Sequence, residues 1–263
     1  MSTVPLYDAF SEDYDRFVNW EARLSFEMPF FRSLFRARNI TRILDVACGT
    51  GRHAIAFAKE GYEVTATDIS SAMVEHARAN VAQAGVDVQV MKLGFGELAG
   101  AVPGVYDAVT CLGNSLPHLT SEGALYAALR DMRAMLAPSG LLVIQNRNFD
   151  RVLETRERFM PPEVHCEGDQ EWMFMRFYDF RGELLRFNVM RLYRQGDGEW
   201  TSHIEATELR AWHYAALRDT LSDVGLGVTH AYGSYRGESF DPSKSGDLVL
   251  IAERSESSET IQR

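Results

Sequence analysis

The chain has 263 residues, 46% of them hydrophobic, and a formal net charge of −10 from 27 basic and 37 acidic side chains. This length suits one sizeable α/β domain with an inserted or appended part. The acidic balance argues against nucleic-acid binding, and no apolar run in the sequence reaches the ~20 residues of a membrane span. Cys48, Cys111 and Cys166 lack metal-ligand spacing, so we expect reduced thiols, no bound metal and a cytoplasmic protein.

The first clear element is an apolar strand at residues 42–46, which runs through Asp45 into a turn containing Gly49 and Gly51. Glycine takes backbone angles closed to other residues and lets a ligand approach the main chain. The turn therefore predicts a site for a nucleotide-like cofactor. Apolar spacing predicts a helix at residues 52–60, followed by a strand at 62–67 that ends at Asp68.

The alternation continues with a helix at residues 71–84, strands at 86–93 and 106–112, a helix at 125–136 closed by residues 138–140, and a buried strand at 141–145. This order predicts an α/β fold with a Rossmann-like, doubly wound, mostly parallel sheet. Three strands at 172–180, 184–194 and 200–210, joined by short glycine turns, predict an antiparallel lid. A helix at 214–224 and a strand at 247–253 follow, and the polar tail at 255–263 is expected to be disordered.

The glycine turn alone leaves the cofactor open, because residues 49–54 also fit the dinucleotide pattern G-x-G-x-x-A. Asp45 separates the two interpretations, since a carboxylate before the turn attracts an ammonium group and repels a pyrophosphate. Asp68 can accept hydrogen bonds from both ribose hydroxyls. A cationic amino-acid end joined to a ribose describes S-adenosylmethionine. The alternative is that both carboxylates only cap strand ends.

Residues 43–51 together with Asp68 resemble the signature of class I S-adenosylmethionine-dependent methyltransferases. In that family an acidic residue after the third strand lies near the adenine, and Gly94 stands at its position here. The resemblance thus implies that backbone groups and Phe95 hold the adenine, with Ile69 and Met73 as apolar walls. For Met73 and Phe95, packing in the core is the alternative.

Residues 111–119 and 141–150 resemble the fourth and fifth strand ends of the glycine and glycine/sarcosine N-methyltransferases. The resemblance implies that Arg147 binds a substrate carboxylate, that Asn114 accepts a hydrogen bond from the substrate amine, and that His118 lies near the reacting groups. Gln145-Asn146 departs from the family pattern, which commonly has His before this Arg.

Residues 20–23 resemble the N-terminal segment of the same group, which covers the cofactor. The resemblance implies that Arg23 pairs with the cofactor carboxylate, a task that suits its planar fork; a solvated helix face is the alternative. Tyr7 and Tyr14 are candidates for contacts near the sulfonium. The complete set of predicted cofactor contacts is Tyr14, Trp20, Arg23, Asp45, Ala47, Cys48, Gly49, Gly51, Asp68, Ile69, Met73, Gly94, Phe95 and Leu112.

We expect residues 1–40 to form a helical segment over the cofactor, 41–150 the cofactor-binding core, 151–210 the inserted lid, and 211–254 the rest of the core. The expected reaction is N-methylation of a small amine or amino acid, with late aromatics such as Tyr235, or Trp212, Tyr214 and Tyr232, closing the pocket. Alternatives are methylation of another O, N or C acceptor, a nicotinamide-dependent oxidoreductase, and a non-catalytic S-adenosylmethionine sensor. A thermal-shift screen with S-adenosylmethionine, followed by S-adenosylhomocysteine release over glycine, sarcosine, dimethylglycine and other amines, would separate these possibilities. A homo-oligomer is left open.

Overall fold

The computed structural model describes residues 5–255, without the side chains of residues 5, 7–10 and 12. The helices are α1 (Pro5–Phe17), α2 (Trp20–Ala37), α3 (Arg52–Lys59), α4 (Ser71–Ala84), α5 (Glu122–Ala134), α6 (Phe149–Thr155) and α7 (Tyr214–Asp223), with a 3-10 turn at Leu116–His118. The strands are β1 (Arg42–Val46), β2 (Glu63–Asp68), β3 (Val88–Lys92), β4 (Tyr106–Cys111), β5 (Leu136–Arg147), β6 (Glu163–Glu167), β7 (Gln170–Arg181), β8 (Leu184–Gln195), β9 (Thr201–Arg210), β10 (Leu226–Tyr232) and β11 (Asp247–Arg254).

The larger sheet has seven strands in the order β10-β11-β5-β4-β1-β2-β3. The five strands from β5 to β3 run parallel, whereas β11 is antiparallel to both of its neighbours. The mostly parallel, doubly wound sheet is thus confirmed. Chain order reverses between β1 and β4, and ligands bind beside the carboxyl ends of the strands at such a switch point.

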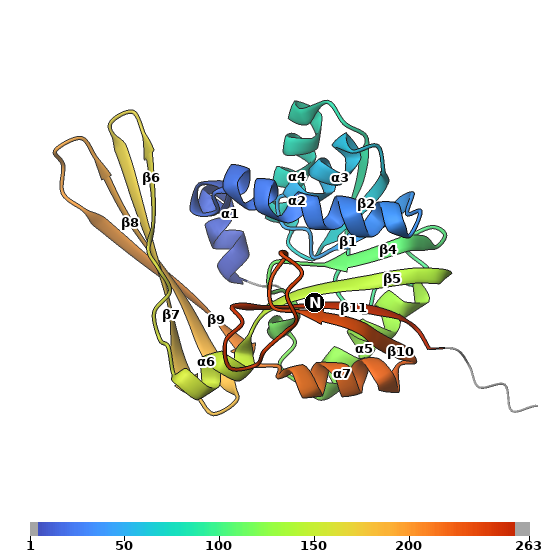
Figure 1. Ribbon diagram of the computed structural model, residues 1–263. Helices are drawn as coiled ribbons and strands as arrows, with labels where there is room; N and C mark the ends of the chain where they lie inside the picture. The colour runs from blue at the N-terminus through green and yellow to red at the C-terminus, as the bar shows by residue number, and fades with distance from the viewer. Residues whose placement is uncertain (1–4, 256–263) are drawn as a thin grey trace, which may run out of the picture.

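Helices cover both faces of this sheet (Figure 1). On one face α2, α3 and α4 bury a core that includes Phe31, Phe35 and Phe57, while α5 and α7 cover the other face with residues such as Leu129 and Leu217. Strands that are buried on both faces need continuous apolar runs, and for this reason the core strands could be predicted from the sequence.

The second sheet is antiparallel, in the order β6-β7-β8-β9, and stands beside the core with α1 between them (Figure 1). Leu6 of α1 packs with Trp172, Phe174 and Val189 of this sheet. The antiparallel lid is confirmed, with four strands instead of the three expected. The additional strand, β6, is a short and largely exposed edge strand of mostly polar residues, so apolar alternation could not reveal it.

The structure differs from expectation at the start of β5 and in the presence of β10. Residues 138–140, expected as a loop, lie inside β5, whose pairing with β4 shifts register between Tyr106 and Ala108. A β-bulge of this kind accommodates a proline that a regular ladder would exclude. β10 was not expected, because its burial alternates poorly. The tail predicted to be disordered lies, from residue 256 on, outside the described residues, and the division of the chain into domains stays a prediction.

Within residues 5–255, no helix combines the length and the apolar character that crossing a membrane requires.

Candidate functional site

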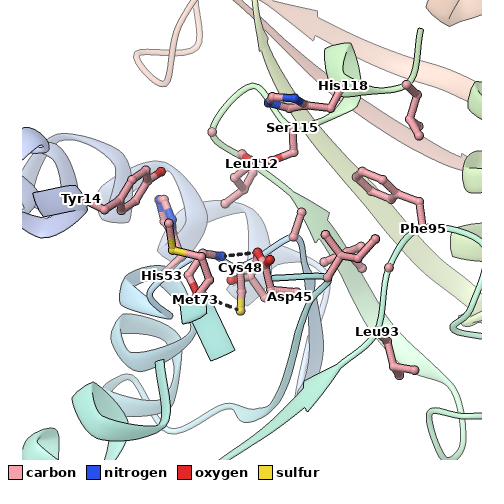
Figure 2. A pocket seen from close by; sticks show the side chains of 18 of the residues that line it. Tyr14, Asp45, Cys48, His53, Met73, Leu93, Phe95, Leu112, Ser115 and His118 are labelled. Carbon is pink, nitrogen blue, oxygen red and sulfur yellow. Dashed lines mark hydrogen bonds between the residues drawn. The ribbon is translucent and has the colours of Figure 1, made fainter. Parts of the chain in front are cut away.

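A cavity opens where β1, β2, β3 and β4 end, and part of α1 and α2 lies over it. Every predicted cofactor contact except Gly51 lines this cavity, and so does His118. Figure 2 shows Tyr14 on the side opposite Phe95 and Leu93, with Asp45 and Cys48 between them. The fold therefore brings together, in one cavity, residues that come from six separate segments of the chain.

Asp45, the last residue but one of β1, is buried at the base of this cavity. Its Oδ1 accepts a hydrogen bond of 2.7 Å from Thr110 Oγ1, whereas Oδ2 has no partner among the described residues. Burial raises the pKa of Asp45 to about 6, although the neighbouring His53 and the Thr110 hydrogen bond act to lower it. A buried carboxylate with an unused oxygen is suited to a cationic group, because a cation supplies the missing partner.

The glycine turn orients the second carboxylate, Asp68. The Gly49 N–H donates to Asp68 Oδ2 at 2.8 Å, and the Ser70 N–H donates to Oδ1 at 2.9 Å. Gly49 has φ +57°, and a Cβ there would face the Tyr14 ring at 3.7 Å. A side chain at residue 49 would thus occupy the narrow space between the turn and α1.

Gly51 is the one predicted cofactor contact that the structure places outside the cavity lining. It precedes α3 with φ +76°, and a Cβ there would lie 3.1 Å from the Ala77 Cβ of α4. The structure thus shows that this glycine permits a left-handed turn and close packing of two helices, and its contact with the cofactor stays a prediction.

The apolar side of the cavity comes from Ile69, Met73, Gly94 and Phe95. A Cβ at Gly94 would lie 2.8 Å from Ile69 Cδ1, the end of a flexible side chain, so a larger residue there would require Ile69 to shift. The Gly94 N–H donates to Glu97 Oε2 at 2.8 Å, and the contact of backbone groups in this segment with an adenine stays a prediction. Met73 is 2% exposed and lines the cavity from α4.

Above the turn, α2 contributes a connected group of polar side chains. Arg23 Nε donates to Glu27 Oε1 at 2.8 Å, and Glu27 Oε2 lies 2.5 Å from His53 Nε2. The Arg23 guanidinium also lies 5.1 Å from the centre of the Trp20 ring. His53 also lines the cavity. Its place in the glycine motif did not predict this position, because its partner Glu27 lies 26 residues away in the sequence.

A second cavity adjoins the first. It shares Tyr14, Arg23 and Gly113 with the first cavity, and it contains Asn114 and Arg147. His118 lies in the first cavity and is absent from the lining of the second. Other residues that line the second cavity are Phe17, Glu27, Gln145, Met160, Glu163, Arg176, Tyr178, Phe187, Tyr235 and Asp247.

Hydrogen bonds fix the floor of the second cavity. Asn114, in the left-handed region with φ +67°, accepts a bond of 3.0 Å from the Arg147 N–H through Oδ1. Gln145 accepts from the Gly113 N–H at 2.8 Å and donates to Asp247 Oδ1 at 3.1 Å. The oxygen predicted to bind the substrate amine thus already holds the end of β5, and a further bond would use its second lone pair.

Arg147 extends from the end of β5 into this cavity, and its buried Nε has no hydrogen-bond partner among the described residues. A buried guanidinium N–H without a partner is costly. The side chain is therefore suited to an anionic ligand.

Burial lowers the pKa of His118 to about 4, so its imidazole is neutral at pH 7 and a weak base. Of the late aromatics, Tyr235 lines the second cavity, whereas Trp212, Tyr214 and Tyr232 line neither cavity. The side chain of Tyr7 lies outside the described residues. Within residues 5–255, no three His, Cys, Asp or Glu side chains gather as a metal site would require.

Comparison with known proteins assigns the chain to a family. Residues 43–140 match the family described as a methyltransferase domain. Over 235 residues the chain is 32% identical to a glycine/sarcosine N-methyltransferase of Parasynechococcus marenigrum. The aligned residues make up 89% of this chain and 79% of that protein.

Solved structures agree on the fold. An S-adenosylmethionine-dependent methyltransferase from Clostridium acetobutylicum superposes with a TM-score of 0.77 at 15% identity, covering 95% of this chain and 99% of that one. An amino pentose methyltransferase from Micromonospora echinaspora with bound S-adenosylmethionine gives a TM-score of 0.71 at 21% identity, covering 97% and 99%. The chain belongs to the class I S-adenosylmethionine-dependent methyltransferases, in the family that includes the glycine/sarcosine N-methyltransferases, and it transfers the methyl group to a small molecule.

Proposed function

We propose that the enzyme N-methylates a small amine that carries a carboxylate, as its glycine/sarcosine-methylating relatives do by name. The observation that carries this proposal is Arg147, a cation with an unpaired buried Nε among the described residues, in a cavity that shares three residues with the cofactor cavity. An arginine binds a carboxylate through two parallel hydrogen bonds. Such an anchor would hold an amino acid with its nitrogen toward the first cavity.

The residues of the first cavity fit the cofactor on chemical grounds. Asp45, with one unused oxygen, suits the cofactor ammonium, and Asp68, held by two backbone donors, suits the ribose hydroxyls. Arg23 lies between the Trp20 ring and Gly113 and suits the cofactor carboxylate. These three roles account for the ammonium and the carboxylate of the amino-acid end of S-adenosylmethionine and for its ribose hydroxyls.

S-adenosylmethionine supplies an activated methyl carbon, to which the amine forms a C–N bond as the S–C bond breaks, leaving S-adenosylhomocysteine. The protein has little covalent chemistry to perform, so its main task is to hold a neutral amine in line. Arg147 anchors the carboxylate, and the Asn114 bond to its backbone fixes the anchor. The methylated ammonium then gives up a proton to water, because His118, with a pKa of about 4, is too weak a base to keep that proton at neutral pH.

The test is S-adenosylhomocysteine release over a panel of glycine, sarcosine, dimethylglycine and simple amines without a carboxylate. We expect turnover to require the carboxylate. Arg147→Leu should raise the KM for the amino acid by about 10- to 100-fold, as expected for a lost hydrogen bond to a charged group, while the KM for the cofactor changes little.

Arg147→Lys is the matched variant, because it keeps the charge and loses the fork; we expect an intermediate KM. An unchanged amino-acid KM in Arg147→Leu, or equal turnover of amines with and without a carboxylate, would overturn the proposal.

A further inference from the structure

Arg176 stands where β7 otherwise buries apolar side chains. Alternate residues of this strand, Trp172, Phe174 and Tyr178, are between 0% and 5% exposed, and Arg176 continues the same series because side chains alternate along a strand. This face of β7 packs toward α1 and lines the second cavity. A charged residue in an apolar series indicates either a compensating partner or a ligand.

The contacts of Arg176 within the protein compensate its charge only in part. Its Nη2 lies 3.3 Å from Glu163 Oε1, and the Glu163 side chain is 45% exposed; solvent-exposed pairs of this kind are weak. Its Cζ lies 4.8 Å from the centre of the Phe17 ring of α1. The buried Nε has no hydrogen-bond partner among the described residues.

Arg176 shares the cavity with the other under-paired arginine, Arg147. Burial lowers the pKa of Arg176, Glu163 acts against this effect, and the positive charge of Arg147 adds to it, so the two like charges lie near each other. Burial also raises the pKa of Tyr178 to about 12 although both arginines act to lower it. The Tyr178 hydroxyl therefore keeps its proton at neutral pH and can donate a hydrogen bond in the same region.

The carboxylates that line this cavity, Glu163 among them, compensate the two arginines only in part. Glu27 is bonded to Arg23 and to His53. Asp247 accepts a hydrogen bond from Gln145 and lies opposite Arg147 in the pairing of β11 with β5, so that the charge of Arg147 acts to lower its pKa, but the two form no ion pair within 4 Å. Two guanidinium groups and a phenol thus converge on one cavity of about 400 Å³ with limited anionic compensation.

We infer that the methyl acceptor is a dianionic amine, with a carboxylate at Arg147 and a second negative charge at Arg176 and Tyr178. This inference rests on the proposed function, because it names the substrate class of the same site. Either a side-chain carboxylate or a phosphonate provides the second charge. A single carboxylate, as in glycine, would leave Arg176 with only the half-exposed Glu163 as its anionic partner.

Binding to the protein loaded with S-adenosylhomocysteine tests the inference without turnover. Calorimetry would compare L-aspartate, L-glutamate and 2-amino-3-phosphonopropanoate, which carries both a carboxylate and a phosphonate, with the less charged L-asparagine, L-glutamine and glycine. We expect the dianionic amines to bind about 10- to 100-fold more tightly, and the phosphonate arm distinguishes the two sources of the second charge. Equal affinities for aspartate and asparagine, and for glutamate and glutamine, with no preference for the phosphonate, would overturn the inference.

The variant Arg176→Gln should lose this preference, weakening the best dianionic ligand about 10- to 100-fold and leaving glycine within about threefold. Arg181→Gln is the matched control, because Arg181 is exposed at the turn end of the same strand. A purely structural Arg176 would instead weaken all amines alike. The wild-type comparison keeps the inference testable if Arg176→Gln does not fold.

The two proposals fail in different ways. Turnover of glycine or sarcosine with no preference for dianionic amines would leave the proposed function standing and remove the inference. Selective binding of dianionic amines without turnover of any amine would remove the proposed function and keep the anion site.

Discussion

The Asp45 side chain lowers the stability of the fold when it is ionised, yet the ionised form is the one suited to bind the cofactor ammonium. Ionising a buried carboxylate costs free energy unless a partner compensates it, and Asp45 Oδ2 has none among the described residues. The folded-state pKa of about 6 lies above the ordinary aspartate value of 3.8. The folded protein therefore binds the Asp45 proton more tightly than the unfolded chain does. The penalty for an ionised Asp45 is absent below pH 4, grows between pH 4 and pH 6, and is constant above.

Asp45→Asn should therefore stabilise the protein without cofactor more at high pH than at low pH. The shift of about 2 pH units corresponds to about 3 kcal/mol at pH 8 as an upper bound, reduced by the unpaired amide donor of the new side chain. Denaturant unfolding at pH 5 and pH 8 measures this effect, and the stability difference between variant and wild type should be about 1 kcal/mol more favourable at pH 8. The same difference at both pH values would contradict the assignment.

Cofactor binding should show the opposite dependence. An ammonium group favours the ionised Asp45, so wild-type affinity for S-adenosylhomocysteine should fall as pH decreases through about 6, approaching tenfold per pH unit. The nearby charges of His53, Asp68 and Arg23 contribute to the same site, so Asp45→Asn serves as the control. It should bind weakly and with a flatter pH profile; a flat wild-type profile from pH 8 to pH 5 would exclude the ammonium contact.

At the scale of elements, α1 connects the two sheets. Asp15 accepts hydrogen bonds from Thr50 Oγ1 at 2.7 Å and Asn80 Nδ2 at 3.1 Å, and it pairs with Arg52. Burial acts to raise the pKa of Asp15, but these hydrogen bonds outweigh it, so the pKa is lowered. On its other side, α1 pairs through Asp13 with Arg191 of β8. The helix that carries Tyr14 is thus held from both directions.

Asp15→Ala should release α1 from the core and weaken binding of S-adenosylhomocysteine about tenfold, because Tyr14 would lose its fixed position over the glycine turn. Calorimetry measures the affinity, and hydrogen exchange of residues 5–17 reports the release of the helix. Glu21→Ala, an exposed substitution in the first turn of α2, is the control. Unchanged affinity together with unchanged exchange would show that α1 does not depend on this contact.

These elements also show what a sequence can predict. The parallel core and the cavity around Asp45, Gly49 and Asp68 were predictable, because both depend on short segments whose chemistry is local. The roles of His53 and Arg176 were not, since each depends on how a helix or strand faces a distant one. The strand β6 was not predicted for a related reason, because an exposed edge strand needs no alternation of apolar residues.

At the scale of the whole molecule, the two cavities form a single unit. Tyr14, Arg23 and Gly113 line both, and they come from α1, α2 and the segment after β4. A ligand in the first cavity that orders these residues also orders one wall of the second. When the acceptor then binds, less conformational entropy remains to be lost in that wall. The two ligands should therefore bind cooperatively.

We therefore expect S-adenosylhomocysteine to raise the affinity for the acceptor amine about tenfold, within the range of typical coupling energies. Calorimetry with glycine and L-aspartate, with and without S-adenosylhomocysteine, measures this ratio. Reciprocity requires that the amine raise the affinity for S-adenosylhomocysteine by the same factor. Tyr14→Ala should reduce the factor in both directions, whereas Arg181→Gln should leave it unchanged. Independent binding of the two ligands in the wild type would show that the shared wall is already ordered before either ligand arrives.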